Sequence, residues 1–221
     1  MFITFEGLDG SGKTTILNLL IQYFKEKYPN LPFISTREPG GHNIPEAERI
    51  RDIILDKNSD LSPVAEAMLY STSRRIHLEK VIWPALEKGE LVLCDRYIDS
   101  FYAYQGFARK LGYDFVKQLT NLIIDNAIPD LTIFFDITPE KSKERRDKNR
   151  LVQDRLDNEK MQFHQDVYLG YQKLISENPS RFIIVDGSEN ADVVCKEVVD
   201  KLHQNPKFLS YINNKNVPDT N

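Results

Sequence analysis

The chain has 221 residues, of which 41% are hydrophobic and 28% charged, and its formal net charge at pH 7 is −4. This length allows one domain with a sizeable core, and the acidic balance is not that of a general nucleic-acid-binding protein. No apolar run approaches the ~20 residues of a membrane span, and the run at residues 2–5 is too short for a secretory signal. We therefore expect a cytosolic protein that binds neither nucleic acid nor membranes.

A phosphate-binding loop lies near the start of the chain. The apolar run Phe2–Phe5 predicts a strand, and the segment from Lys13 to about Tyr28 predicts a helix. Between them, residues 7–14 (GLDGSGKT) have the spacing G-x-x-x-x-G-K-[ST] of the P-loop. Glycines let successive backbone N–H groups converge on an anion, at the positive end of the helix dipole. Lys13 is expected to reach the outer phosphates, and Thr14 to ligand Mg²⁺.

Strands and helices alternate along the rest of the chain. Short apolar runs predict four more strands, and helical periodicity predicts the helices between them. The strands are expected at 31–36, 91–94, 131–136 and 181–186, and the main helices at 45–55, 62–88, 113–126, 157–177 and 192–203. Pro84 should bend the end of the long helix. The alternation predicts an α/β fold with a parallel sheet between two helical layers.

The predicted elements form a single domain over residues 1–204. A very charged segment at about 139–156 is expected to act as a lid within this domain. The last residues, 205–221, are polar and predict a flexible C-terminal tail.

Charged residues follow two of the predicted strands. Ligands of parallel α/β sheets bind outside the carboxyl ends of the strands, and Arg37, Glu38, Asp95 and Arg96 stand there. Asp95 has the place of the acidic group that holds Mg²⁺ or its water shell in P-loop proteins. Arg96 beside it suits a forked contact with a phosphate. A helix cap for Asp95 and a surface ion pair for Arg96 are the alternative interpretations.

The charged segment suits a reaction on phosphates. Charge runs are usually solvated helix faces, but phosphoryl transfer needs cations on the oxygens that gain charge. The P-loop supplies only Lys13, so we interpret residues 141–150 as part of the lid, with Arg150 as the favoured arginine. No water-activating residue and no N-K-x-D string is identifiable, which favours transfer to a second substrate over hydrolysis. The arginines outside the P-loop indicate that this acceptor is itself a phosphate.

Three stretches together are far more specific than the P-loop alone. They are FEGLDGSGKTT at 5–15, TREPGG at 36–41, and DRY at 95–97 with AYQG at 103–106. They resemble the bacterial type of thymidylate kinase, and the resemblance runs to about His203. It implies a P-loop NTPase fold with a five-stranded sheet in the order 2-3-1-4-5. It also implies transfer of the γ-phosphoryl group of ATP to dTMP with Mg²⁺, giving dTDP and ADP, and a homodimer joined through packed helices.

The resemblance assigns roles to single positions. Asp9 is similar to the P-loop carboxylate that contacts the dTMP sugar, and Arg37 and Arg96 match the arginines on the acceptor phosphate. Tyr70 matches the aromatic residue that stacks on thymine and Arg74 the arginine that bonds its O4; four residues apart, the two share a helix face. The other dTMP-binding residues that it implies are Glu38, Pro39, Ser100, Tyr104 and Gln105. The implied ATP-binding residues are Gly7, Leu8, Asp9, Gly10, Ser11, Gly12, Lys13, Thr14, Thr15 and Arg145. The implied catalytic residues are Asp9, Lys13, Arg96 and Arg150, and the implied metal ligands are Thr14 and Asp95.

The chain departs from the family pattern in ways that leave alternatives open. Its P-loop carries no arginine, so it resembles the type whose catalytic arginine comes from the lid. Phe101 stands where a small or polar residue is common, and it could reshape the base pocket. A kinase of another nucleoside monophosphate or of a deoxynucleoside is one alternative, although Arg37 and Arg96 count against a nucleoside acceptor. A P-loop ATP-dependent switch protein is the alternative from another functional class.

Overall fold

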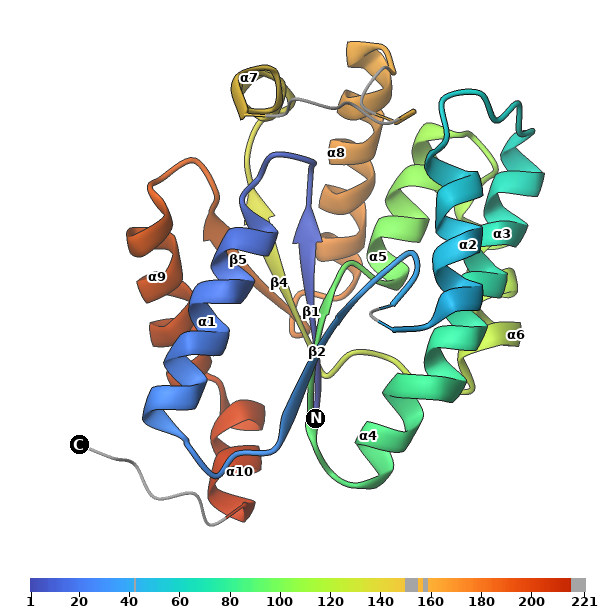
Figure 1. Ribbon diagram of the computed structural model, residues 1–221. Helices are drawn as coiled ribbons and strands as arrows, with labels where there is room; N and C mark the ends of the chain where they lie inside the picture. The colour runs from blue at the N-terminus through green and yellow to red at the C-terminus, as the bar shows by residue number, and fades with distance from the viewer. Residues whose placement is uncertain (42, 150–154, 157–158, 216–221) are drawn as a thin grey trace.

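The fold is built on a sheet of five parallel strands in the order β2-β3-β1-β4-β5 (Figure 1). The computed structural model describes residues 1–41, 43–149, 155–156 and 159–215. The predicted fold class and strand order are confirmed. The strands are β1 (Phe2–Gly7), β2 (Phe33–Arg37), β3 (Leu91–Asp95), β4 (Leu131–Asp136) and β5 (Phe182–Asp186).

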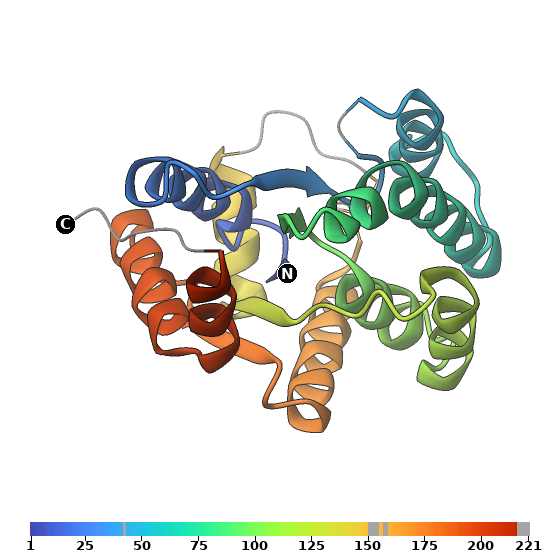
Figure 2. The same ribbon diagram turned by 90° about the horizontal axis from the view of Figure 1, so that it is seen from below.

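Helices cover both faces of the sheet, which is why the central strands are apolar on both sides. Ile3 and Phe5 of β1 belong to one core cluster, with side chains from α1 (Lys13–Lys27), α9 (Ala191–Gln204) and α10 (Pro206–Asn214). In Figure 2 these are the blue and red helices on one side of the molecule. The opposite face packs against most of the remaining helices. Those are α3 (Pro63–His77), α4 (Trp83–Glu87), α5 (Ile98–Phe101), α6 (Tyr113–Ile124) and α8 (Met161–Glu177); the other two helices are α2 (Pro45–Leu55) and α7 (Pro139–Asn149).

Two π-helical segments interrupt the helices beside the sheet: η1 (Leu78–Ile82) and η2 (Tyr102–Ala108). The sequence predicts one bent helix over 62–88, whereas the structure has α3, η1 and α4 in succession. The wider i→i+5 turn of η1 ends just before Pro84, whose missing N–H interrupts the normal α-helical pattern.

The segment after Asn205 is a helix, and the predicted flexible tail is therefore wrong for its described part. Asn205 caps α10, because its Oδ1 accepts hydrogen bonds from the backbone N–H groups of Lys207 and Phe208 at 3.0 and 3.4 Å. Phe208 and Ile212, four residues apart, are buried in the core on the α1 side. The polar composition of this segment gave no indication of the short amphipathic helix, which has a capping residue and two buried apolar side chains. Residues 216–221 lie outside the described residues.

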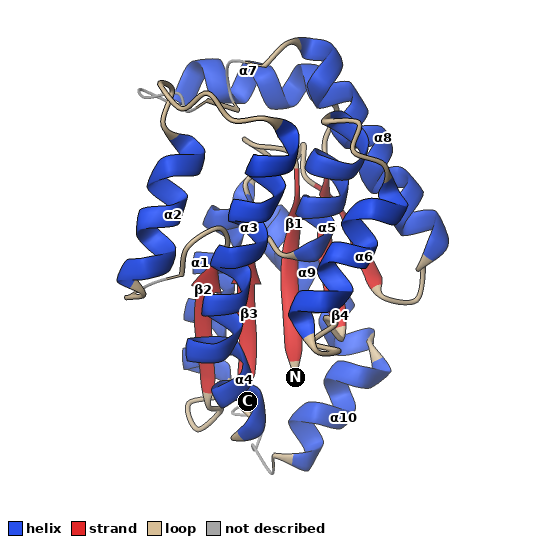
Figure 3. Cartoon of the chain, turned by 90° about the vertical axis from the view of Figure 1, so that its right-hand side faces the viewer, coloured by secondary structure: helices blue, strands red, loops and turns tan. Residues whose placement is uncertain are grey.

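The strand register brings three loops to one edge of the sheet. Arg37 of β2 pairs with Asp95 of β3, and Asp95 pairs with Phe5 of β1, so these carboxyl ends are level. Helix α7 lies across this edge of the molecule (Figure 3). No helix in the described part of the chain is long and apolar enough to cross a membrane.

Candidate active site

The P-loop forms between β1 and α1 as the sequence predicts. Gly10 and Gly12 have φ values of 82° and 92°, the left-handed conformation that glycine adopts without strain. Lys13 Nζ donates hydrogen bonds to the carbonyl oxygens of Gly7 and Leu8 at 3.1 and 2.9 Å. Burial, and then the positive charge of Arg96, lower the pKa of Lys13 to about 8. The ammonium group is thus held inside the loop, where an anion would favour its charged form.

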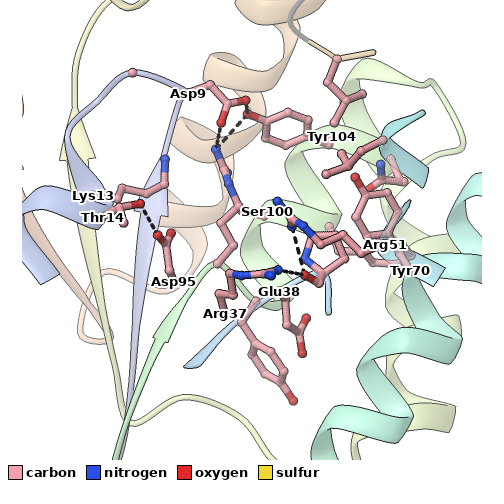
Figure 4. A pocket seen from close by; sticks show the side chains of 18 of the residues that line it. Asp9, Lys13, Thr14, Arg37, Glu38, Arg51, Tyr70, Asp95, Ser100 and Tyr104 are labelled. Atoms are coloured by element: carbon pink, nitrogen blue, oxygen red, sulfur yellow. Dashed lines mark hydrogen bonds and ion pairs between the residues drawn. The ribbon is translucent and has the colours of Figure 1, made fainter. Parts of the chain in front are cut away.

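Thr14 and Asp95 face each other across the edge of the sheet. The Thr14 hydroxyl donates to Oδ2 of Asp95 at 2.5 Å (Figure 4). Thr14 lies in the first turn of α1 and Asp95 ends β3, so the register of the sheet makes this contact. Hydroxyl and carboxylate oxygens are ligands that suit Mg²⁺, which usually takes one or two protein ligands together with substrate phosphates and water.

Arg96 connects the end of β3 to the P-loop and to two helices. Its Nη2 lies 2.7 Å from Oδ1 of Asp9, and its Nη1 donates to Ser100 Oγ at 2.8 Å. Tyr104 donates to the other oxygen of Asp9 at 3.1 Å, and its ring lies under the guanidinium. Four residues that the sequence predicts for one site are therefore joined in one network of contacts centred on Arg96.

Glu6 holds in place the residues around Arg96, and no sequence motif indicates this role. Its carboxylate is fully buried and accepts hydrogen bonds from the Tyr97 backbone N–H at 2.8 Å and the Tyr171 hydroxyl at 2.9 Å. It also accepts from Ser100 at 2.5 Å. Burial and the nearby charge of Asp99 raise the pKa of Glu6. Arg96 has a φ of 68°, and the Glu6 contact fixes the chain directly after this left-handed residue.

A buried ion pair joins Glu38, the residue after β2, to α3. Glu38 Oε2 accepts from Arg74 Nε at 2.8 Å, and Glu38 Oε1 lies 3.1 Å from His77 Nδ1. The Arg74 guanidinium lies 5.0 Å from the ring centre of Phe101 and 5.2 Å from that of Tyr97. Its Nη1 is buried and has no hydrogen-bond partner among the described residues. A buried unpaired donor costs free energy, so this nitrogen is suited to a ligand oxygen.

Arg37 and Arg51 meet at the loop after β2. Arg37 Nη1 and Arg51 Nη1 both donate to the carbonyl oxygen of Pro39, at 2.8 and 3.0 Å. Arg37 also pairs with Glu48 at 2.7 Å. The sequence predicts Arg37 here but not Arg51, whose position inside α2 gave no motif signal.

Helix α7 contacts the P-loop directly. The Ser142 hydroxyl donates to the Asp9 carbonyl oxygen at 2.7 Å, and a Cβ added to Gly10 would lie 3.1 Å from Cγ of the buried Arg146. Arg145 instead donates to the carbonyl oxygens of Gly187 and Ser188, at 2.6 and 2.8 Å. Sequence reasoning singled out Arg145 and missed Arg146, because one charged helical run does not indicate which arginine faces inward.

Two arginines beyond α7 belong to the predicted lid segment. Arg150 lies outside the described residues. Arg155 Nε donates to the Ile54 carbonyl oxygen at 3.0 Å, and its guanidinium pairs with Glu66 of α3. The described contacts of Arg155 are therefore with α2 and α3.

Residues of the P-loop, of the segments after β2 and β3, and of α2, α3, α5, η2 and α7 line one cavity of about 460 Å³ (Figure 4). The described residues predicted for the site all line it except Gly7, Leu8 and Ser11, which lie in the P-loop backbone behind Lys13. The prediction that Tyr70 and Arg74 share a helix face is confirmed, because both line the cavity from α3. The lining residues to which sequence reasoning gave no role are Arg51, Leu55, Tyr97, Arg146 and Leu156.

Comparisons with known proteins identify the family of this chain. The family model "Thymidylate kinase" matches residues 5–198. A thymidylate kinase of Mycoplasmopsis agalactiae is 59% identical over 208 residues, covering 94% of this chain and 97% of the relative. One of Mesomycoplasma hyopneumoniae is 48% identical over 204 residues, covering 90% and 95%. The crystal structure of thymidylate kinase from Ehrlichia chaffeensis superposes with a TM-score of 0.75 at 33% identity, covering 92% and 98%. The chain belongs to the thymidylate kinase family, the kinases that phosphorylate dTMP to dTDP.

Proposed function

We propose that the cavity holds dTMP between α3 and η2, and the phosphates of ATP at the P-loop. The observation that carries this arrangement is that Lys13, Arg96 and Arg74 line one continuous cavity. Lys13 belongs to the P-loop, Arg96 pairs with Asp9 of that loop, and Arg74 lies against the rings of Tyr97 and Phe101. A nucleoside monophosphate has the matching order of groups, a phosphate followed by a sugar and a flat base.

The base is proposed to lie against Tyr70 and Phe101. Their ring centres are 6.3 Å apart and their planes differ by 58°, so they form two walls of the pocket. Flat bases stack well on aromatic rings. The buried Nη1 of Arg74 is a donor for a carbonyl oxygen such as O4 of thymine.

The reaction is in-line phosphoryl transfer. An oxygen of the dTMP phosphate forms a bond to the γ-phosphorus of ATP, while the bond from that phosphorus to the β-γ bridging oxygen breaks and ADP leaves. The acceptor oxygen is already a nucleophile, so no general base is needed. Arg96 and Arg37 are proposed to hold the acceptor phosphate, and Lys13 to stabilise the charge on the transferred group. Asp9 orients Arg96 through their ion pair.

Mg²⁺ is the proposed metal cofactor, and Thr14 and Asp95 are the residues that would hold it. Their contact across the sheet edge brings two suitable oxygens next to the P-loop. The ion would supply positive charge to the phosphate oxygens. Thr14 and Asp95 would orient the nucleotide through that site.

The lid is proposed to span residues 139–156, with Arg150 as the arginine on the transferred phosphate. The described part of this segment supports the proposal, because α7 touches the P-loop at Asp9 and Gly10. Arg145 is proposed to lie beside the nucleotide, since it lines the cavity and holds the loop after β5. Arg146 is a second cation at this end of the cavity.

A homodimer is the proposed assembly, formed through α3 and α6. Helices α3 and α6 contact each other, and both carry exposed large apolar side chains. Val64 and Met68 are four residues apart on α3, and Phe115 and Leu122 seven apart on α6, so each pair lies on one helix face. Analytical ultracentrifugation should give twice the chain mass, and Leu122→Glu combined with Met68→Glu should give monomers.

The cytosol is the proposed compartment. Cys94 and Cys195 are both free thiols, the form that reducing compartments maintain. Cell fractionation with an antibody to the protein would test this assignment.

The activity is tested by coupled ADP release with MgATP and a panel of acceptors: dTMP, dUMP, dCMP, dGMP, thymidine and none. We expect strong turnover with dTMP. Comparable turnover with other monophosphates would retain the kinase and exclude a selective thymine pocket. ADP release without any acceptor would instead support a nucleotide-dependent switch.

A further inference from the structure

Glu66 is a buried carboxylate beside the part of the cavity that is proposed to hold dTMP. It lies on α3, and its side chain is 1% exposed. Arg109, the residue that follows η2, donates hydrogen bonds of 3.2 and 3.4 Å to the Glu66 carboxylate, and Arg155 pairs with Oε2 of Glu66. Gln105 Nε2 donates to its Oε1 at 3.0 Å. Buried carboxylates are rare unless paired, and this one has an amide among its partners as well as two arginines.

The charges around Glu66 keep it ionised. Burial raises the pKa of Glu66, but the hydrogen bond from Gln105 and the positive charges of Arg109 and Arg155 outweigh this, so that its pKa lies below the ordinary value. Glu159 in turn pairs with Arg109, so the cluster of two carboxylates and two guanidinium groups is neutral. Glu66 therefore has no proton to donate, and both of its oxygens act as acceptors.

An ionised Glu66 dictates the orientation of the Gln105 amide. A carboxylate can bond the amide NH₂ group but not the amide oxygen, so Nε2 must face Glu66. The amide is planar, and its Oε1 then points away from the carboxylate. Gln105 lines the cavity, and no donor in the described part of the chain bonds its Oε1. The oxygen is thus the end of this side chain that remains for a ligand.

We propose that Glu66 is a positioning residue. It holds the Gln105 side chain so that the amide oxygen, and not the NH₂ group, faces the base of the bound dTMP. This inference rests on the proposed placement of dTMP in the cavity. A fixed acceptor at Gln105 matches the N3–H donor of thymine, while Arg74 supplies a donor for a carbonyl oxygen. Cytosine has an unprotonated N3, which would face the acceptor oxygen of Gln105, and an amino group, which would face the donor of Arg74. Neither contact could be a hydrogen bond. Glu66 thereby contributes to the choice of base without touching it.

The test substitutes Glu66→Gln and measures kcat/KM for dTMP and for dCMP. A neutral amide at position 66 can donate as well as accept, so the Gln105 amide becomes free to turn its NH₂ group towards the base. We expect kcat/KM to fall for dTMP and to rise for dCMP, so that their ratio drops by about tenfold or more. A merely structural role would lower both values in parallel, and that result would overturn the proposal.

Glu79→Gln is the matched control, because Glu79 follows α3, is exposed and pairs with Arg75 at 2.6 Å. It should leave the ratio unchanged. Gln105→Met should lower the ratio by itself, and adding Glu66→Gln to that variant should change the ratio no further. A further drop in the double variant would show that Glu66 does not act through Gln105.

A second variant covers the event that Glu66→Gln does not fold. Glu66→Asp keeps the charge that balances Arg109 and Arg155 but shortens the side chain, so its contact with Gln105 is lost. It should also lower the ratio, and an unchanged ratio would overturn the proposal. If wild-type protein showed no preference for dTMP over dCMP, the proposed acceptor site would be wrong. A strong wild-type preference that survives both Glu66 variants would contradict the role of Glu66 alone.

Discussion

Arg96 and Asp9 form an ion pair in which Nη2 and Oδ1 are 2.7 Å apart, and this pair joins the end of β3 to the P-loop. The proposed acceptor-phosphate arginine is therefore attached to the loop that binds the donor phosphates. Tyr104 of η2 donates to Asp9, and Ser100 of α5 accepts from Arg96. Phosphoryl transfer depends largely on placing two phosphates correctly, and in the proposed binding mode this network would fix their relative position.

Arg96→Lys should lower kcat for dTMP by about 10²-fold and raise the KM for dTMP. Lysine keeps the positive charge but loses the fork that contacts Asp9 with one nitrogen and Ser100 with the other. Steady-state kinetics with dTMP varied at saturating ATP would measure both constants. Arg49→Lys, an exposed substitution on α2, is the control and should have no effect. A change of less than twofold in both constants for Arg96→Lys would remove Arg96 from the reaction.

The free enzyme should bind ATP less well as the pH rises past about 8, the pKa of Lys13. Lys13 is charged below this pH, and its charged form attracts the phosphates. Hence kcat/KM for ATP should be constant below about 8 and fall above it, whereas kcat should fall at higher pH because bound phosphates raise this pKa. Lys13→Ala should lower kcat by about 10²- to 10³-fold at every pH. A kcat/KM that stays constant well above pH 8 would contradict a titrating Lys13.

Arg74→Met should weaken dTMP binding more than ATP binding and also destabilise the fold. The substitution removes the donor at Nη1 and leaves Glu38 as a buried carboxylate without its arginine, a loss of about 3–5 kcal/mol in the free energy of unfolding. Calorimetric titration and urea unfolding would measure the two effects. Arg75→Met is the matched control on the same helix, since its ion pairs are exposed and should contribute little to stability. Equal losses of dTMP and ATP affinity would argue against a base contact by Arg74.

Arg150→Ala should lower kcat by about 10²-fold or more while changing dTMP affinity much less, because this arginine is proposed to act on the transferred group. Single-turnover kinetics would separate the chemical step from binding. Lys148→Ala is the control, because Lys148 is exposed and pairs with Glu144 at 2.6 Å. If KM alone changes, the arginine on the transferred phosphate is elsewhere, and Arg146 is the next to test.

Local signals in the sequence predicted the sheet and most of the residues that line the cavity. The P-loop, Arg37 and Asp95 were predictable because each follows a strand, and all parallel strands end at one edge. Glu66 was not, because it stands in a helix without a motif and its partner Arg155 is 89 residues away. The role of Glu6 was hidden in the same way, since Tyr171 reaches it from α8 across 165 residues. Long-range polar contacts such as these depend on the packing of whole helices, which hydrophobic periodicity does not specify.

Phe208→Ala should destabilise the protein by about 3–5 kcal/mol, although sequence composition assigns Phe208 to a flexible tail. Phe208 is fully buried, and its ring stacks on Phe24 of α1 with 5.9 Å between the ring centres. The neighbouring substitution Leu209→Ala is the control, because Leu209 is exposed and its truncation should cost little. Urea unfolding would measure both variants, and kinetics at low temperature should show normal activity because α10 packs far from the carboxyl ends of the strands (Figure 1). Equal stability of the two variants would mean that α10 adds nothing to the core in solution.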